Sequence, residues 1–205
     1  MQSFIQRIPE LLEGMFEHEV PIPQSFTCRC GQEEILRCLE CWKSPRFCAS
    51  CMLETHRSLP FHRMQRWNGE RYVPIALVDL GLVIGLGHEH DNVCPQIPHQ
   101  HPPRQFNVVH TNGHHRVALQ LCHCHGHPNP VRQLMRMGLF PATVQDPQRI
   151  SCAFTFATLA DFHIQSLTSK KSAYDYCDAL CRHTDRAFSH TVTVRVLYPL
   201  TTMIG

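Results

Sequence analysis

The sequence predicts an α+β fold, and three observations carry this prediction. Residues 28–62 contain six cysteines and two histidines at short, ordered spacings. The stretches 106–110 and 115–121 flank an Asn-Gly pair, which is a strong hairpin signal, and the second stretch alternates apolar and other residues. The stretches 151–167 and 172–188 are typical of helices. We therefore expect a cysteine-rich finger, then a β-hairpin subdomain, then C-terminal helices.

Composition is that of a globular chain. Apolar residues make up 43% and charged residues 18% of its 205 residues, enough for one or two domains with a buried core. The net charge of +2 is too small to indicate a nucleic-acid partner by itself. Most of the cationic side chains are arginines, whose planar guanidinium suits bidentate contacts with phosphate. Residues 1–20 lack the features of a signal peptide, and the longest apolar run, 75–86, is too short to span a bilayer. We expect an intracellular chain with no membrane contact, whose clustered cysteines bind metal.

Local signals define further elements. Pro9 favours a helix start near the N-terminus. Residues 131–137 predict a short helix that Gly138 ends, and Ser151 and Ser172 are predicted N-caps. The expected segments are an N-terminal helix and linker at 1–25, a two-metal finger at 26–70, a β-rich subdomain with a third metal site at 71–130, a helical segment at 131–188 and an unassigned tail at 189–205.

The cysteines and histidines of residues 28–62 predict two zinc sites. Zinc takes four thiolate or imidazole ligands in a tetrahedron, and short Cys-x-x-Cys turns supply two thiolates to one ion. Free cysteines buried only for packing have no reason to fall into close pairs. Because the segment has little apolar content, we expect metal binding to supply much of its folding free energy. The eight predicted ligands are Cys28, Cys30, Cys38, Cys41, Cys48, Cys51, His56 and His62.

The order of these pairs resembles that of a B-box finger, in which alternate pairs share a metal in a cross-brace. The resemblance implies one site of Cys28, Cys30, Cys48 and Cys51, and a second of Cys38, Cys41, His56 and His62. Sequential pairing, the first four ligands against the last four, is the alternative, since spacing does not decide between them. One residue separates Cys28 from Cys30 where two are usual, so the first turn must be tighter.

A third zinc site is predicted around the hairpin. Cys94 precedes the hairpin, and Cys122 and Cys124 follow its second arm, so the ends of the hairpin bring the three thiols together. His88 is the preferred fourth ligand and His90 the alternative. The other nearby histidines are interpreted as solvated loop residues: His99, His101, His110, His114, His115, His123, His125 and His127.

No sequence motif indicates catalysis. His88-Glu89-His90 is not the His-Glu-x-x-His pattern, and the chain contains no deaminase, dinucleotide-binding or Walker signature. Cys177 and Cys181 lie four residues apart on one face of a predicted helix, which favours core packing. We expect a chain with no enzymatic activity and no catalytic residue.

Longer motifs extend the zinc-binding interpretation to most of the chain. Their order is similar to that of the CxC-type cysteine-cluster domain that accompanies KDZ (Kyakuja, Dileera and Zisupton) transposases, mostly in basidiomycete fungi. The resemblance covers about 26–188 and implies a zinc-binding module, presumed to act on nucleic acid, placed N-terminal to a transposase domain. Because the chain ends soon after residue 188, we expect no transposition from it. The motifs are Cys28-x-Cys30, RCLECW (37–42), FCASCMLETH (47–56), LPFHRMQRWNG (59–69), LGLVIGLGH (80–88), Cys94-Pro95, NVVHTNGHHRVALQLCHC (107–124), QLMRMGLFPAT (133–143) and SAYDYCDALCRHTD (172–185).

Three functions are consistent with these features. The first is weak DNA binding in the nucleus through a basic patch around Trp67, formed by Arg57, Arg63, Arg66 and Arg71. The second is a zinc-dependent interaction with another protein, favoured by the balanced overall charge. The third is a non-functional remnant of a mobile element. Retention on DNA that weakens with salt favours the first function over the second.

Overall fold

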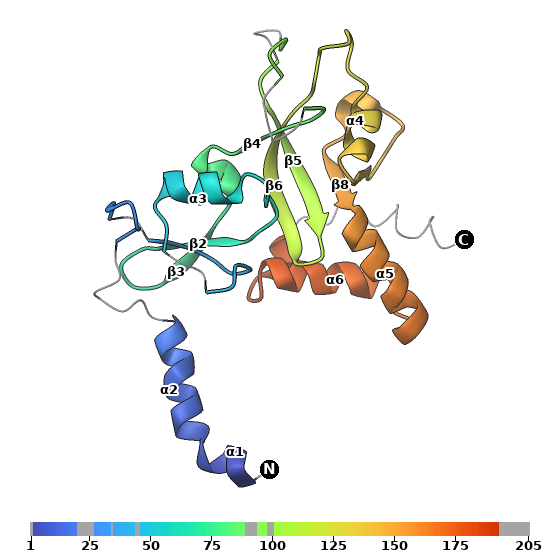
Figure 1. The fold of residues 1–205 in the computed structure, drawn as a ribbon. Coiled ribbons are helices and arrows are strands. Elements are labelled where there is room, and N and C mark those ends of the chain that lie inside the picture. Colours follow the sequence, from blue (N-terminus) through green and yellow to red (C-terminus); the bar gives the residue numbers. More distant parts are fainter. Residues whose placement is uncertain are drawn as a thin grey trace. The chain divides into compact units, whose positions relative to one another are not determined.

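The chain forms two compact units, each containing helices and strands, so the predicted α+β fold is confirmed (Figure 1). The first unit consists of residues 1–56 and 62–75, and the second of residues 57–61 and 76 onward. The computed structural model describes residues 2–19, 27–33, 35–43, 46–88, 94–97 and 101–192.

The first unit contains a three-stranded antiparallel sheet. Its strands β1 (Leu36–Cys38), β2 (Met64–Trp67) and β3 (Tyr72–Ile75) pair in that order, and helix α3 (Ala49–His56) lies between β1 and β2 in the chain. Because β3 completes this sheet, the unit extends to residue 75 rather than ending at 70. Helices α1 (Gln2–Gln6) and α2 (Ile8–Glu19) precede the sheet. Pro9 lies in the first turn of α2, where its missing N–H leaves no hydrogen bond unmade.

Few apolar side chains form the core of this first unit. Leu36, Phe47, Met52 and Met64 are each at most 4% exposed. Leu36 and Phe47 exchange backbone hydrogen bonds of 2.9 and 3.0 Å, which joins the segment before α3 to β1. So small a core is typical of domains that need metal ions for stability.

A five-stranded mixed sheet forms the second unit. The predicted hairpin consists of β5 (Arg104–His110) and β6 (Gly113–Gln120). β4 (Val83–Gly85) pairs parallel with β6, and β8 (Cys152–Thr155) pairs parallel with β5. The turn is Thr111-Asn112, and Gly113 opens β6 with a φ of +131°. A Cβ on Gly113 would lie 2.6 Å from Thr184 Oγ1, so the hairpin tip requires glycine. In spatial order the strands are β4 (Val83–Gly85), β6 (Gly113–Gln120), β5 (Arg104–His110), β8 (Cys152–Thr155) and β7 (Leu139–Pro141).

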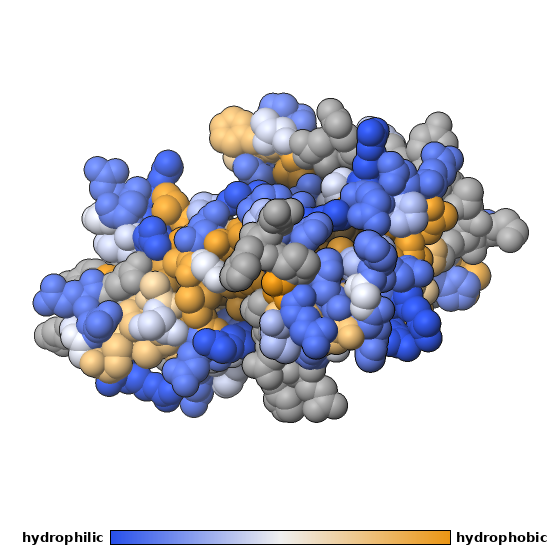
Figure 2. All heavy atoms as spheres, turned by 90° about the horizontal axis from the view of Figure 1, so that it is seen from above, coloured by the Kyte–Doolittle hydropathy of each residue, from blue (hydrophilic) through white to orange (hydrophobic). Residues whose placement is uncertain are grey.

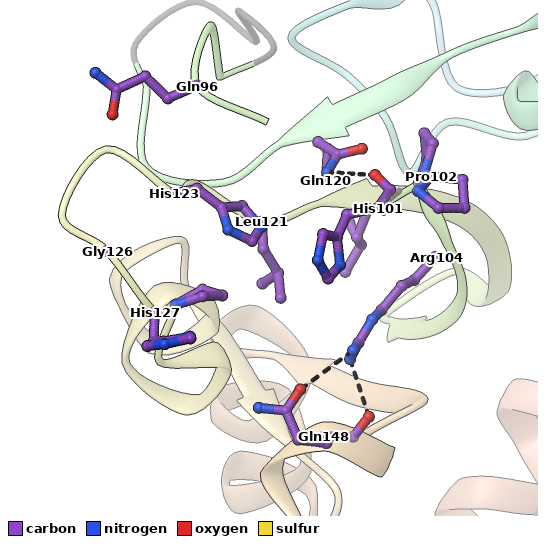
Figure 3. Close-up of a pocket in the computed structure, with 13 residues that line it drawn as sticks. Gln96, His101, Pro102, Arg104, Gln120, Leu121, His123, Gly126, His127 and Gln148 are labelled. Atoms are coloured by element: carbon purple, nitrogen blue, oxygen red, sulfur yellow. Dashed lines mark hydrogen bonds between the residues drawn. The ribbon is translucent and has the colours of Figure 1, made fainter. Parts of the chain in front are cut away.

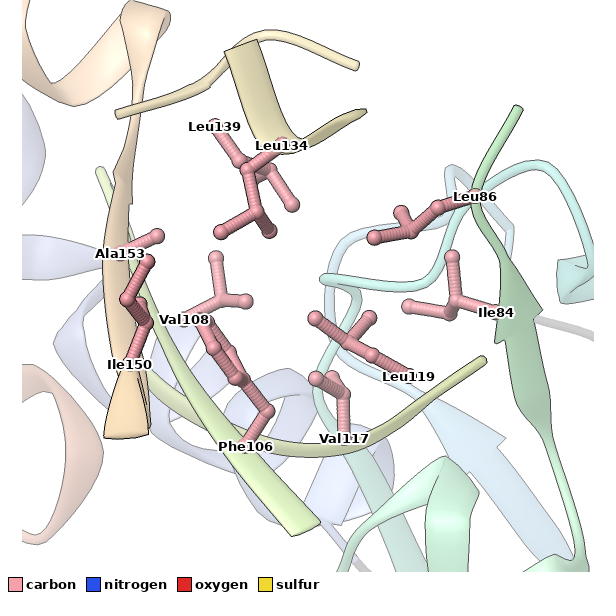
Figure 4. Close-up of a cluster of buried hydrophobic side chains, with 10 residues drawn as sticks. All are labelled: Ile84, Leu86, Phe106, Val108, Val117, Leu119, Leu134, Leu139, Ile150 and Ala153. Atoms are coloured by element: carbon pink, nitrogen blue, oxygen red, sulfur yellow. The ribbon is translucent and has the colours of Figure 1, made fainter. Parts of the chain in front are cut away.

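Each face of this sheet has its own core. Figure 4 shows the first core, in which Phe106 and Val108 of β5 pack with Leu134 of α4 (Pro130–Arg136). Val109 and Phe154 point to the opposite face, where they pack with α5 (Phe156–Ser169) and α6 (Ala173–Thr184). Residues 71–130 and 131–188 were expected as separate segments. Because β7 and β8 join the sheet of the hairpin, residues 76–130 and 131–188 instead belong to one unit.

The start of the predicted helix 151–167 was wrong. Cys152–Thr155 is strand β8, because it is buried between β5 and β7 and pairs with both. Thr155, not Ser151, is the N-cap of α5, and its hydroxyl accepts the Thr158 N–H at 3.2 Å. For residues 152–155, pairing in the sheet therefore overrides the local preference for helix. Ser172 does cap α6, through the N–H of Asp175 at 3.1 Å.

The remaining elements are short. Helix α4 matches the predicted helix 131–137, and Gly138 follows it with a φ of +73°. Most of the unassigned tail, 193–205, lies outside the described residues. No helix in the described ranges is long and apolar enough to cross a membrane. On the face in Figure 2, hydrophilic residues predominate and hydrophobic residues show between them. The single-turn helices are η2 (Leu77–Leu80), η4 (Pro147–Arg149) and η5 (Ser189–Thr191).

Candidate metal centres

Four sulfur atoms converge in the first unit. The Sγ atoms of Cys28, Cys30, Cys48 and Cys51 all lie within 4.8 Å of one another, and those of Cys30 and Cys48 are 3.6 Å apart. A tetrahedral zinc ion with Zn–S bonds of about 2.3 Å places its sulfur ligands about 3.8 Å apart. The set therefore has the dimensions of a zinc site, and its members are those implied by the cross-brace pairing.

Local backbone structure explains how this first cluster forms. The Gly31 N–H donates to the Cys28 carbonyl at 2.8 Å, and Gly31 has a φ of +89°, which glycine adopts without strain. This tight turn accommodates the single-residue spacing between Cys28 and Cys30. Cys48 lies just before α3 and Cys51 in its first turn, so the helix start brings the second pair together.

Hydrogen bonding and crowding shift the cysteine pKa values of the first cluster in opposite directions. The Ser50 hydroxyl, 3.2 Å from Cys48 Sγ, and the Cys51 N–H lower the pKa of Cys48 to about 6. The neighbouring thiols of Cys28 and Cys48 raise the pKa of Cys51 to about 12. Four thiols this close do not all ionise unless a cation compensates their charge. A divalent ion supplies that compensation, so the donor set fits zinc.

The second cluster combines two thiols and two imidazoles. Cys38 Sγ lies 3.4 Å from His62 Nδ1, and Cys41 Sγ lies 3.3 Å from His56 Nε2 and 3.6 Å from His62 Nδ1. Tetrahedral zinc places sulfur and nitrogen ligands about 3.5 Å apart, so these distances also match. All four ligand atoms lie within 4.8 Å of one another. Cys38 ends β1 and His56 ends α3, so α3 carries Cys51 of the first cluster near its start and His56 of the second cluster at its end.

Two contacts orient the ligands of the second cluster. His56 is fully buried, and its Nδ1 lies 3.0 Å from the Met52 carbonyl, so Nδ1 carries the proton and Nε2 is free for a metal. Glu40, between the two cysteines, accepts the N–H and the Nε–H of Arg63, each at 2.6 Å. This ion pair fixes the loop of Cys38 and Cys41 next to His62. Sequence reasoning missed Glu40, whose position inside the Cys38-x-x-Cys41 turn was the available signal.

The third cluster lies in the second unit, at one end of its sheet. Because β4 and β6 run parallel, both end at the same edge, and His88 and Cys122 follow those ends. His88 Nε2 lies 3.2 Å from Cys122 Sγ and 3.5 Å from Cys124 Sγ, and Cys94 Sγ lies 3.5 Å from Cys124 Sγ. The four ligand atoms lie within 4.8 Å of one another. The alternative ligand His90 lies outside the described residues.

Backbone and side-chain contacts support this third cluster. Gln133 of α4 accepts the Cys122 N–H at 2.9 Å and donates to the Cys122 carbonyl at 2.8 Å, a clamp that no sequence signal predicts. Burial alone would raise the pKa of Cys94, but the backbone N–H groups of His123 and Gln96 lower it to about 6. Gly87 approaches Cys122 so closely that a Cβ would lie 3.0 Å from the Cys122 Cβ.

Cysteines outside the three clusters pack in the core. Cys152, Cys177 and Cys181 are 8%, 4% and 3% exposed, so core packing is confirmed for the pair on α6. Burial raises the pKa of Cys177 to about 11 and that of Cys152 to about 12. These thiols are therefore protonated and unreactive at neutral pH.

Three of the histidines expected in solvated loops, His110, His114 and His115, lie instead on the hairpin strands. His110 is half-buried, and its Nδ1 lies 2.9 Å from Thr155 Oγ1. His115 is 8% exposed, and its Nε2 lies 2.7 Å from Asn112 Oδ1. The interpretation as solvated loop residues was wrong for these three, because tertiary contacts cover the turn end of the hairpin. The Phe61 ring lies 5.4 Å from that of His110 and 5.8 Å from that of His115, and the His114 N–H donates to Thr184 Oγ1 at 2.7 Å.

The predicted basic patch does not present four equivalent cations. Arg63 is paired with Glu40, so the adjacent carboxylate offsets its charge. Arg66 and Arg71 are exposed in the first unit, whereas Arg57, also exposed, belongs to the second. Trp67 is half-buried, and its ring centroid lies 5.1 Å from that of Tyr72.

Comparison with known proteins identifies a family. The family described as "CxC2 like cysteine cluster associated with KDZ transposases" matches residues 77–187, a narrower range than the expected 26–188. The matched residues include the whole third cluster, whereas both clusters of the first unit precede them. No curated protein and no solved structure matches the chain. Because the match spans more than half of the sequence, the chain belongs to the CxC2-like cysteine-cluster family associated with KDZ transposases.

Proposed function

We propose that this chain is a zinc-binding, non-catalytic module that binds DNA. The observation that carries the proposal is the set of three clusters, each of which offers four thiolate or imidazole donors at tetrahedral spacing. Structural zinc sites have four protein ligands, whereas catalytic sites keep one position open for water or substrate. Each cluster fills all four positions, so its metal stabilises the fold and has no site for chemistry.

DNA as the ligand is supported by the family's association with transposases and by the exposed cations. Arg66 lies on β2 and Arg71 just before β3, on either side of the turn that joins these strands. Trp67 lies between them in the chain. Arg66 and Arg71, both exposed in the first unit, release about two counterions on binding duplex DNA, which gives a log-log salt slope of about −2. On this proposal we expect a nuclear protein with weak, largely sequence-independent affinity.

The test is a salt titration with the zinc-loaded full chain. Fluorescence anisotropy of a labelled duplex and of its single strand, measured over a range of salt concentrations, gives the slope. The double variant Arg66→Ala/Arg71→Ala should reduce the slope by about two and leave the zinc content unchanged. Arg186→Ala, at an exposed arginine after α6, is the matched control and should bind as the wild type does. No retention of either form of DNA at low salt would refute the proposal.

A specific observation favours a second function, the binding of another protein. The apolar side chains of α1 and α2 are 46–72% exposed, and no described side chain of α2 is buried. Within α2 their spacing places them along one helical face, next to the carboxylates of Glu10, Glu13 and Glu17. An apolar groove with a basic rim is the complementary partner surface. The exposed apolar residues are Phe4, Ile5, Ile8, Leu11, Leu12, Met15 and Phe16.

One experiment distinguishes protein binding from DNA binding as the function of the N-terminal helices. Leu11→Asp/Met15→Asp should abolish capture of a co-purifying protein if the helix is a docking element, while zinc content and DNA affinity stay as in the wild type. Loss of DNA affinity in this variant would assign the helix to DNA binding and remove the second function.

A further inference from the structure

A cavity of about 790 Å³ lies beside the third metal cluster, within the second unit. Its walls come from the start of β5, the end of β6, the loop that follows β6, and η4. Figure 3 shows the side chains that line this cavity. The volume lies within the range of pockets that hold small organic ligands. None of the lining residues is acidic, and none is a metal ligand of the three clusters.

Flat surfaces form one wall of this cavity. The rings of His101 and His123 lie with their centroids 5.2 Å apart at an angle of 40°, and Leu121 and Pro102 add apolar surface beside them (Figure 3). His123 lies between two ligands of the third cluster, and its N–H donates to Cys94 Sγ at 3.4 Å. The backbone of the metal site therefore fixes this wall. Imidazole rings and apolar side chains are surfaces on which unstacked bases are bound.

Polar groups complete the cavity. Arg104 donates from Nη1 to the Gln148 carbonyl at 3.0 Å and from Nη2 to Gln148 Oε1 at 3.3 Å, which orients the guanidinium. These bonds use two of its five N–H donors, and no acidic side chain pairs with Arg104 among the described residues. Gln120, which is 4% exposed, lines the cavity and donates to the His101 carbonyl at 3.3 Å. Glutamine amides bind base edges and a guanidinium binds phosphate.

The geometry points to this cavity as a binding site for one unpaired nucleobase, with the adjoining phosphate on Arg104. The inference rests on the proposed nucleic-acid function and adds its preferred form: a strand with an unstacked base. A base inside a duplex does not reach such a cavity, because it must first leave the stack. A metal ion is a poorer occupant, since His101, His123 and His127 do not form a group of metal-binding geometry in the part of the chain that is described.

The experiment uses the full zinc-loaded chain and a single strand that carries one 2-aminopurine, whose fluorescence responds to unstacking. Wild type should change this fluorescence on the single strand and bind it more tightly than the matching duplex. Arg104→Ala and His101→Ala alter exposed residues and should each weaken single-strand affinity about fivefold or more, with all zinc retained. Arg186→Ala and His163→Ala, at exposed positions outside the cavity, are the matched controls and should have no effect.

The outcomes distinguish this inference from the function on which it rests. Single-strand binding that is unchanged in both cavity variants, or weakened equally by the controls, overturns the inference while DNA binding stands. Absence of binding to any strand overturns both. The same strand made of DNA and of RNA identifies the source: loss of either complex in both cavity variants supports the inference and names the nucleic acid.

Discussion

Replacing Cys41 with serine should remove one zinc ion and unfold much of the first unit. Cys41 Sγ lies 3.3 Å from His56 Nε2 and 3.6 Å from His62 Nδ1, so the change takes a thiolate out of a complete ligand set. A structural zinc site contributes about 10–16 kcal/mol of binding free energy at neutral pH. By contrast, each buried apolar side chain of the small core contributes about 1.5–3 kcal/mol. The four residues Leu36, Phe47, Met52 and Met64 together therefore supply only about 6–12 kcal/mol, less than one zinc site, so this core does not compensate for the loss of the ion.

The assay combines native mass spectrometry with amide hydrogen exchange. Wild type should carry three zinc ions, and Cys41→Ser two or fewer, with exchange protection lost in β1, β2 and α3 and retained in β5 and β6. Cys177→Ala is the control, because Cys177 packs in the core of the second unit and lies in none of the clusters. It should keep three zinc ions. Three ions in Cys41→Ser, or equal zinc loss in both variants, would refute the ligand assignment.

Two further predictions concern the second unit. Gln133→Ala removes the clamp on the Cys122 backbone, so the third zinc should be lost to a chelator at about 10–100-fold lower concentration, while the other two resist as in wild type; equal resistance of all three ions would contradict this. Burial raises the pKa of Cys177 from 9.0 to about 11, so its thiol stabilises the fold at neutral pH, and this contribution should disappear as pH rises from about 9 through 11. Urea unfolding at pH values across this window should show that the free energy of unfolding falls as pH rises, and that it falls less in Cys177→Ala than in wild type. An identical fall in the two proteins would exclude Cys177 as a source of this pH dependence.

How far the sequence predicts the site depends on the kind of interaction. Close cysteine pairs report metal binding because thiolates must lie near one ion, so the twelve predicted ligands are brought together in three groups of four. The residues that hold the ligands in place give no such pattern in the sequence. Gln133 acts on Cys122 from a separate helix, through a contact that no spacing in the chain encodes. His110 and His115 lie in the predicted hairpin arms, but their burial comes from contacts with Phe61, which is distant in the chain.

The sequence by itself determined the elements whose signals are local: the hairpin around Asn112-Gly113, the N-cap at Ser172 and the ligand pairs. These signals depend on backbone preferences and on bonds between residues a few positions apart. Only the tertiary structure decided which pairs share a metal, that residues 152–155 form a strand, and that His88 meets Cys122. The parallel pairing of β4 with β6 brings His88 to Cys122 from 34 positions away, a contact whose geometry belongs to the sheet and not to the spacing of residues along the chain.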